Sequence, residues 1–123
     1  MKDKRKIDRR YLLYYMRIFD AKTRQQIGNL VDITPGGIMI VSERPLPEGQ
    51  TTRLRMELTD EVSDKPFMEF SAHSKWCEPD IIPNLYNTGY EILDLAPEDV
   101  KIVQRIIDEF GFRENKPIKN NPG

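Results

Sequence analysis

A two-residue alternation of apolar and polar side chains is the feature that most constrains the fold of this 123-residue chain. It is clearest in residues 51–58, where Thr52, Leu54, Met56 and Leu58 alternate with polar neighbours. This period belongs to a β-strand with one face in water. The alternation returns in residues 67–76, and the positions expected on one face there are Met68, Phe70, Ala72, Ser74 and Trp76.

Four further segments are rich in branched and aromatic residues and predict more strands. They span residues 11–19, 26–33, 38–42 and 85–92. Polar stretches, several with Gly or Pro, separate the six segments and predict the connections between them. Four of these connections are residues 20–24, 45–49, 59–66 and 78–84, and the fifth joins the segments 26–33 and 38–42.

The period of the pattern changes near the C-terminus. From Pro97 the apolar residues recur at helical spacing, at Val100, Val103, Ile106, Ile107 and Phe110. The proline in the first turn, two acids after it and Gly111 beyond the last apolar residue are typical of helix ends. We therefore predict an all-β dominated fold, a six-stranded antiparallel β-barrel with one C-terminal α-helix at its edge or mouth.

The length fits one domain, which we place at residues 11–112. Residues 113–123 are expected to be a disordered tail, and residues 1–10 a basic flexible arm. Residues 1–17 hold seven lysines and arginines against two acids, a local charge of +5, so the net charge of −1 leaves −6 for the rest. Such an arm attracts anions, although a solvated tail that aids solubility also explains a short basic run.

The cellular setting follows from what the sequence lacks. Cys77 is the only cysteine, so an internal disulfide is excluded and a reducing compartment is expected. No apolar run approaches the roughly 20 residues of a membrane span, and none behind the basic N-terminus has signal-peptide length. We expect a cytoplasmic protein without a membrane span.

Candidate catalytic and metal-binding residues are few. His73 is the only histidine, and strand alternation places it opposite the face of Phe70. Cys77 has no partner at metal-ligand spacing and is expected to be a half-buried structural thiol. No phosphate-binding loop and no dinucleotide fingerprint is present. We predict a protein that is not an enzyme and holds no metal and no cofactor.

The join between the second and third predicted strands is the hexapeptide Asp32-Ile-Thr-Pro-Gly-Gly37. Pro35 fixes φ near −65°, and the two glycines are free to take the positive φ that a sharp reversal needs. Asp32 and Thr34 would flank the turn with short polar side chains. An ordinary β-turn accounts for these residues, and so does a binding loop on a rigid scaffold.

A second motif lies in the basic arm, 23 positions before Asp32. Arg5 and Arg9 form an RxxxR pair, with Arg10 adjacent. Together, in this order, the two motifs resemble those of the PilZ domain, a bacterial receptor for the second messenger cyclic di-GMP, in which an RxxxR arm precedes the barrel and a (D/N)xSxxG turn joins two of its strands. The resemblance extends over most of the chain and implies a split barrel with a C-terminal helix.

The resemblance also implies roles for individual residues. Arg5 and Arg9, with Arg10, would close over the ligand, because arginine can bond guanine O6 and N7 or pair with phosphate. Asp32 would accept hydrogen bonds from guanine N1 and N2. The hydroxyl of Thr34 and backbone N–H groups near it and Gly36 would meet phosphate or base, while Gly37 would permit the turn and close approach.

Two departures from the family pattern concern this site. Thr34 stands where the family usually has Ser, which keeps the hydroxyl but adds a methyl group. Arg10 also offers a shifted register, Lys6 to Arg10, and we prefer Arg5 and Arg9 because only they are both arginines.

The leading hypothesis is a non-catalytic receptor for cyclic di-GMP. Ligand would order the arm against the barrel, and the altered surface would be recognised by a downstream protein partner. A ligand-free adaptor that binds another protein is the alternative. A barrel that binds RNA or single-stranded DNA through the arm is a third hypothesis, against which the acidic body argues.

Overall fold

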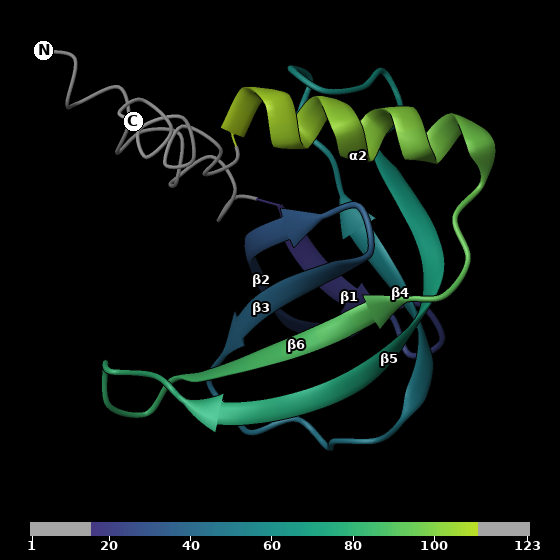
Figure 1. Ribbon diagram of the computed structural model, residues 1–123. Helices are drawn as coiled ribbons and strands as arrows, with labels where there is room; N and C mark the ends of the chain where they lie inside the picture. Colours follow the sequence, from purple (N-terminus) through teal and green to yellow (C-terminus); the bar gives the residue numbers. More distant parts are fainter. Residues whose placement is uncertain (1–15, 111–123) are drawn as a thin grey trace, which may run out of the picture.

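The computed structural model describes residues 16–110, which form a closed six-stranded antiparallel barrel and one helix (Figure 1). The elements are β1 (Arg17–Asp20), β2 (Gln26–Thr34), β3 (Gly37–Ser42), β4 (Thr51–Glu57), β5 (Phe67–Pro79), β6 (Tyr86–Ile92) and α2 (Pro97–Phe110). Around the barrel the strands follow the order β1-β2-β3-β6-β5-β4, and β1 closes it by pairing with β4. The predicted fold class is confirmed.

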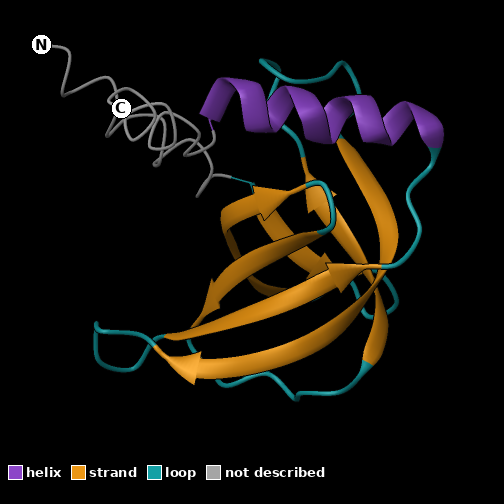
Figure 2. Cartoon of the chain, viewed as in Figure 1, coloured by secondary structure: helices purple, strands orange, loops and turns teal. Residues whose placement is uncertain are grey.

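Closure of the barrel follows from the alternation seen in the sequence. On β4 and β5 five inward apolar side chains are fully or almost fully buried: Leu54, Met56, Met68, Phe70 and Ala72. Each large apolar side chain of this kind contributes about 1.5–3 kcal/mol on burial. Helix α2 lies across one end of the barrel, where Ile102, Val103 and Ile106 complete the core (Figure 2).

Three sequence expectations lie partly or wholly outside the described residues. They are the basic arm at residues 1–10, the tail at residues 113–123 and the start of the first strand, which was expected at residues 11–19. Within the described part, that strand covers Arg17–Asp20.

Strand β5 departs from the prediction because it carries a bulge. The register shifts between Ser74 and Trp76, and the strand continues to Pro79, into the segment predicted as a connection. An extra residue in one strand reverses the facing of those that follow. Lys75 and Trp76 are therefore both exposed, and the expectation that Trp76 shares the inner face with Phe70 was wrong.

The buried face of α2 also differs by one position from the predicted stripe. Val100 is half exposed, whereas Ile102 is buried together with Val103 and Ile106. Asp99, one turn before Ile102 and Val103, lies on the same buried face, and only 6% of its side chain is exposed. Its Oδ1 accepts a hydrogen bond from Lys65 Nζ at 2.7 Å. The ion pair joins the β4–β5 loop to the start of the helix, so a carboxylate occupies one of the buried positions of α2.

We expect Asp99→Ala to lower the free energy of unfolding by about 1–3 kcal/mol, because it removes a largely buried ion pair and a charge at the helix N-terminus. Urea denaturation measures this change. Glu98→Ala is the matched control: Glu98 lies in the same turn but is exposed, so its loss should cost less than about 1 kcal/mol. Equal losses in the two variants would show that the contact with Lys65 adds nothing.

Candidate functional site

The turn between β2 and β3 is tied to the neighbouring strand. Thr34 pairs with Gly37, with Pro35 and Gly36 between them. The carbonyl oxygen of Gly36 accepts a hydrogen bond from the backbone N–H of Ile92 at 2.9 Å. The Thr34 hydroxyl lies 3.4 Å from the carbonyl oxygen of Gly37, to which it donates. The turn is therefore fixed against the end of β6.

The two glycines of this turn serve a different purpose from the predicted one. In the described part of the chain the only glycine with positive φ is Gly49, so the expectation of positive φ at Gly36 or Gly37 was wrong. Gly37 is required by close packing, because a Cβ there would lie 2.6 Å from the carbonyl oxygen of Tyr90. A Cβ on Gly36 would meet no atom within 4 Å, so that side of the turn is open.

A bulge in β2 turns Asp32 outward. The register shifts between Leu30 and Asp32, so that Leu30 and Ile33 both face the core while Asp32 and Thr34 lie outside. Asp32 is half-buried, and its Oδ1 accepts a hydrogen bond from the backbone N–H of Ile33 at 2.9 Å. Among the described residues no cation forms an ion pair with this carboxylate.

A row of four paired residues crosses the outer surface from this carboxylate. Asp32 pairs with Met39, Met39 with Gly89, and Gly89 with Trp76, so the row spans β2, β3, β6 and β5. A Cβ on Gly89 would lie 2.4 Å from Cε2 of the indole. Gly89 thus provides the space in which the Trp76 ring lies against the strand, with 37% of the residue still exposed.

These residues line one shallow cavity of about 410 Å³. Its lining comprises Asp32, Ile33, Thr34, Gly36, Gly37, Ile38, Met39, Lys75, Trp76, Gly89, Tyr90 and Glu91. The Lys75 ammonium lies 3.5 Å from a carboxylate oxygen of Glu91. Burial raises the pKa of Tyr90 to about 12, so its phenol is neutral at physiological pH. The cavity therefore combines an aromatic ring, acceptor carboxylates, one ammonium and exposed turn backbone.

Four of the predicted site residues meet here, and three lie elsewhere in the chain. Asp32, Thr34, Gly36 and Gly37 share the cavity, whereas Arg5, Arg9 and Arg10 lie outside the described residues. The first described residue, Met16, accepts a hydrogen bond at its carbonyl oxygen from the N–H of Leu30 at 3.1 Å. The chain therefore enters the barrel beside β2, two residues from Asp32.

Sequence analysis missed Lys75 and Trp76 as candidate site residues. Strand alternation placed Trp76 inside the barrel, and only the bulge of β5 brings it to the outer surface beside Gly89. The only sequence signal for an exposed Trp76 is Gly89 on the neighbouring strand, and their pairing is known only once the register of β5 and β6 is known.

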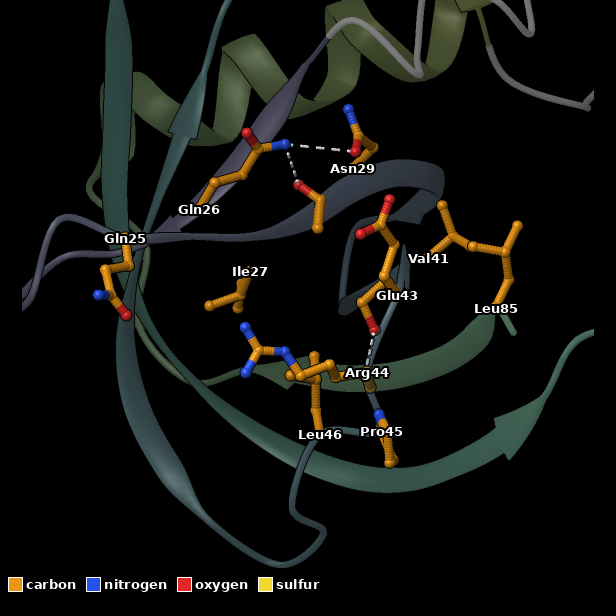
Figure 3. Close-up of a pocket in the computed structure, with 12 residues that line it drawn as sticks. Gln25, Gln26, Ile27, Asn29, Val41, Glu43, Arg44, Pro45, Leu46 and Leu85 are labelled. Carbon is orange, nitrogen blue, oxygen red and sulfur yellow. Dashed lines mark hydrogen bonds between the residues drawn. The ribbon is translucent and has the colours of Figure 1, made fainter.

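A larger cavity of about 490 Å³ lies apart from the motif residues (Figure 3). It is lined by residues 25–29 of β2 and the turn before it, by residues 41–46, and by Leu85. It has no aromatic residue in its lining and no residue of the hexapeptide. Its size alone therefore does not make it the better candidate for a ligand that resembles a dinucleotide.

The two residues considered for catalysis or metal binding, His73 and Cys77, lie outside the cavity of the motif residues. His73 lies on the outer face, as predicted, with Nδ1 2.8 Å from the Thr51 hydroxyl, and Cys77 is half-buried. Within residues 16–110 no group of three His, Cys, Asp or Glu side chains could hold a metal ion. Likewise, α2, the helix of the described region, is too short and too polar to cross a membrane.

Comparison with known proteins identifies the family. The family model of the PilZ domain matches residues 3–109 of the chain, which include both motifs. The chain belongs to the PilZ domain family. This family comprises receptors for cyclic di-GMP, and its members are generally non-catalytic binding domains.

One solved structure supports the PilZ fold independently of the family model. It is the Bacillus subtilis inhibitor of motility (MotI/DgrA), with 18% identity and a TM-score of 0.59. The match covers 85% of this PilZ chain and 47% of the inhibitor, so this chain corresponds to about half of that protein. No curated protein matches the chain.

The packing of Trp76 on Gly89 can be tested with one methyl group. Gly89→Ala should displace the indole into water and shift its fluorescence to longer wavelength, with a loss of about 1–3 kcal/mol in unfolding free energy. Trp76 is the only tryptophan, so the emission reports this ring alone. Gly36→Ala is the control and should leave the spectrum unchanged, because its Cβ meets open space. An unchanged spectrum in Gly89→Ala would contradict the placement of the ring.

Proposed function

We propose that this PilZ domain is a non-catalytic receptor that binds cyclic di-GMP in the cavity between the β2–β3 turn and Trp76. The observation that carries the proposal is the convergence of Asp32, Thr34, Gly36 and Gly37, the residues of the family motif, beside an exposed indole. The ligand consists of two guanosine units joined by two phosphates, so it needs a base-stacking surface, acceptors for the guanine edge and cations.

The outer wall of the barrel offers a surface for one guanine. A base stacked on Trp76 would gain about 1–3 kcal/mol. Gly89 and Gly37 carry no side chains, so the base can approach the strands closely. From there the N1–H and N2–H groups of guanine point toward the free lone pairs of the Asp32 carboxylate, and an adenine presents no such pair of donors at this edge.

The phosphates require cations, and the described cavity supplies only Lys75, which is already beside Glu91. The RxxxR arm provides the remainder in this proposal. Arg9 lies seven residues before Met16 and Arg5 eleven, and eleven extended residues span up to about 36 Å. The arm is therefore long enough to bring Arg5, Arg9 and Arg10 over the cavity, with binding expected in the micromolar range because ordering the arm costs entropy.

The output of this receptor would be a change of surface. Ligand joins the arm to the outer wall of β2, β3, β6 and β5, and the combined surface is what a downstream protein would recognise. Without ligand the arm is strongly basic and the barrel is acidic. The phosphates of the ligand would neutralise part of the positive charge of the arm, so the charge of this surface differs between the two states.

Calorimetric titration of cyclic di-GMP into the full chain tests the proposal, with GTP and cyclic di-AMP as ligand controls. We expect selective saturable binding to the parent protein. Asp32→Ala should weaken it about 10- to 100-fold through the loss of charge-assisted hydrogen bonds, and Arg5→Ala with Arg9→Ala should weaken it at least as much. Arg24→Ala is the matched control, an exposed arginine outside the cavity, and should bind like the parent.

Two results would contradict the proposal. A flat titration on folded protein would favour the ligand-free adaptor, and unchanged affinity in the Asp32 variant would place the ligand elsewhere. Thr34→Ser refines the test, because removal of the extra methyl group should leave the affinity equal or higher if the hydroxyl faces the ligand.

A further inference from the structure

The loop between β5 and β6 displays two neighbouring isoleucines to solvent. Ile81 is 95% exposed and Ile82 57% exposed, more than any other large apolar residue in the described part of the chain. The loop projects beyond the barrel, at the lower left of Figure 1. Single exposed apolar residues are common, but an adjacent pair at a projecting tip is typical of an interaction site. We call residues 80–85 the tip loop.

Hydrogen bonds hold the tip loop in one shape. Asp80 Oδ2 accepts from the backbone N–H of Ile82 at 2.9 Å, and Oδ1 accepts from Asn87 Nδ2 at 2.7 Å. The N–H of Asp80 donates to the carbonyl oxygen of Leu85 at 2.9 Å. The hydrogen bonds that the Asp80 carboxylate accepts from Ile82 and Asn87 hold its pKa below the usual value. The two isoleucines are therefore presented by a preorganised loop, which lowers the cost of ordering on binding.

The larger cavity of about 490 Å³ lies at the base of this loop. Leu85 closes the tip loop and also lines the cavity (Figure 3). Ser42 of the cavity wall pairs with Tyr86, which pairs with Pro79. Its apolar lining includes Ile27, Val41, Leu46 and Leu85. An apolar tip loop thus adjoins a cavity of mixed polar and apolar lining on the same end of the molecule.

The charges around the tip loop and the cavity are complementary. Glu78 lies exposed just before the tip loop, and Arg44 lies exposed on the cavity rim. Within the described residues neither side chain takes part in an ion pair. Glu43 stands beside Arg44 on the rim, so a partner carboxylate must approach from the arginine side.

We propose that the occupant of the cavity is the tip loop of a second copy of this chain. In a two-fold dimer the same patch faces itself, so residue i of one copy contacts residue j of the other and the reverse. Because the tip loop and the cavity adjoin on one end of the molecule, a single two-fold rotation inserts the isoleucines of each copy into the cavity of the other. The same rotation brings Glu78 of each copy to Arg44 of the other. None of these residues lines the candidate cyclic di-GMP cavity, so the dimer does not depend on ligand binding.

Sedimentation equilibrium of the full chain without ligand tests this dimer over a wide range of protein concentrations. We expect a concentration-dependent dimer. Ile81→Ser with Ile82→Ser should weaken association at least about 100-fold, since four isoleucines leave the interface. The matched control is Leu93→Ser with Val100→Ser, two half-exposed apolar residues before and within α2, which should leave association unchanged.

A charge exchange tests the register of the dimer. Arg44→Glu and Glu78→Arg should each weaken association about tenfold, and the two changes in one chain should restore it, because the pair re-forms with reversed sign. Circular dichroism of each variant verifies that the barrel is folded. A parent protein that stays monomeric, a dimer that survives the Ile81 and Ile82 changes, or equal weakening by the control would each overturn the proposal.

Discussion

The outer wall of the barrel depends on two interruptions of strand alternation. In β2 the inward phase set by Gly28 and Leu30 would carry Asp32 into the core, and in β5 the phase set by Ala72 and Ser74 would carry Trp76 there. A bulge in each strand adds one residue and reverses the phase. The carboxylate and the indole therefore reach the same outer surface, while Ile33 remains inside. The core depends on the regular alternation of buried side chains, whereas the candidate site depends on the bulges in β2 and β5, where that alternation is interrupted.

Close approach between strands provides the floor of that surface. Gly37 and Gly89 each stand where a Cβ would collide with a neighbour, a backbone carbonyl in one case and the indole in the other. Between the indole and the Asp32 carboxylate lie Gly89, which has no side chain, and Met39, whose side chain is apolar, and such a surface is chemically suited to a planar base. The β5–β6 hairpin that carries Trp76 and Gly89 also carries the tip loop at its end. One hairpin would therefore present the indole to a ligand and the isoleucines to a second copy.

The regular part of the fold could be predicted from the sequence because it depends on local periodicity. Alternation located the strand from Thr51 to Glu57, branched and aromatic residues located the strand from Tyr86 to Ile92, and helical spacing located α2. The bulges could not be predicted, since they arise from the pairing of strands distant in sequence. Asp99 was missed for the same reason: its burial depends on Lys65, which comes from a loop 34 residues earlier. The motif residues of the site were found through the family pattern, whereas Trp76 required the register.

The most direct measurement is an amide correlation spectrum of ¹⁵N-labelled protein during titration with cyclic di-GMP. We predict that shifts concentrate on the backbone of Asp32 to Gly37, on Gly89 and on the indole N–H of Trp76. These signals come from four strands and one turn, so their joint movement would locate the ligand on the outer wall. Shifts confined to Gln25 through Asn29 and to Arg44 through Leu46, with an unmoved indole signal, would place the ligand in the other cavity and contradict binding at the outer wall.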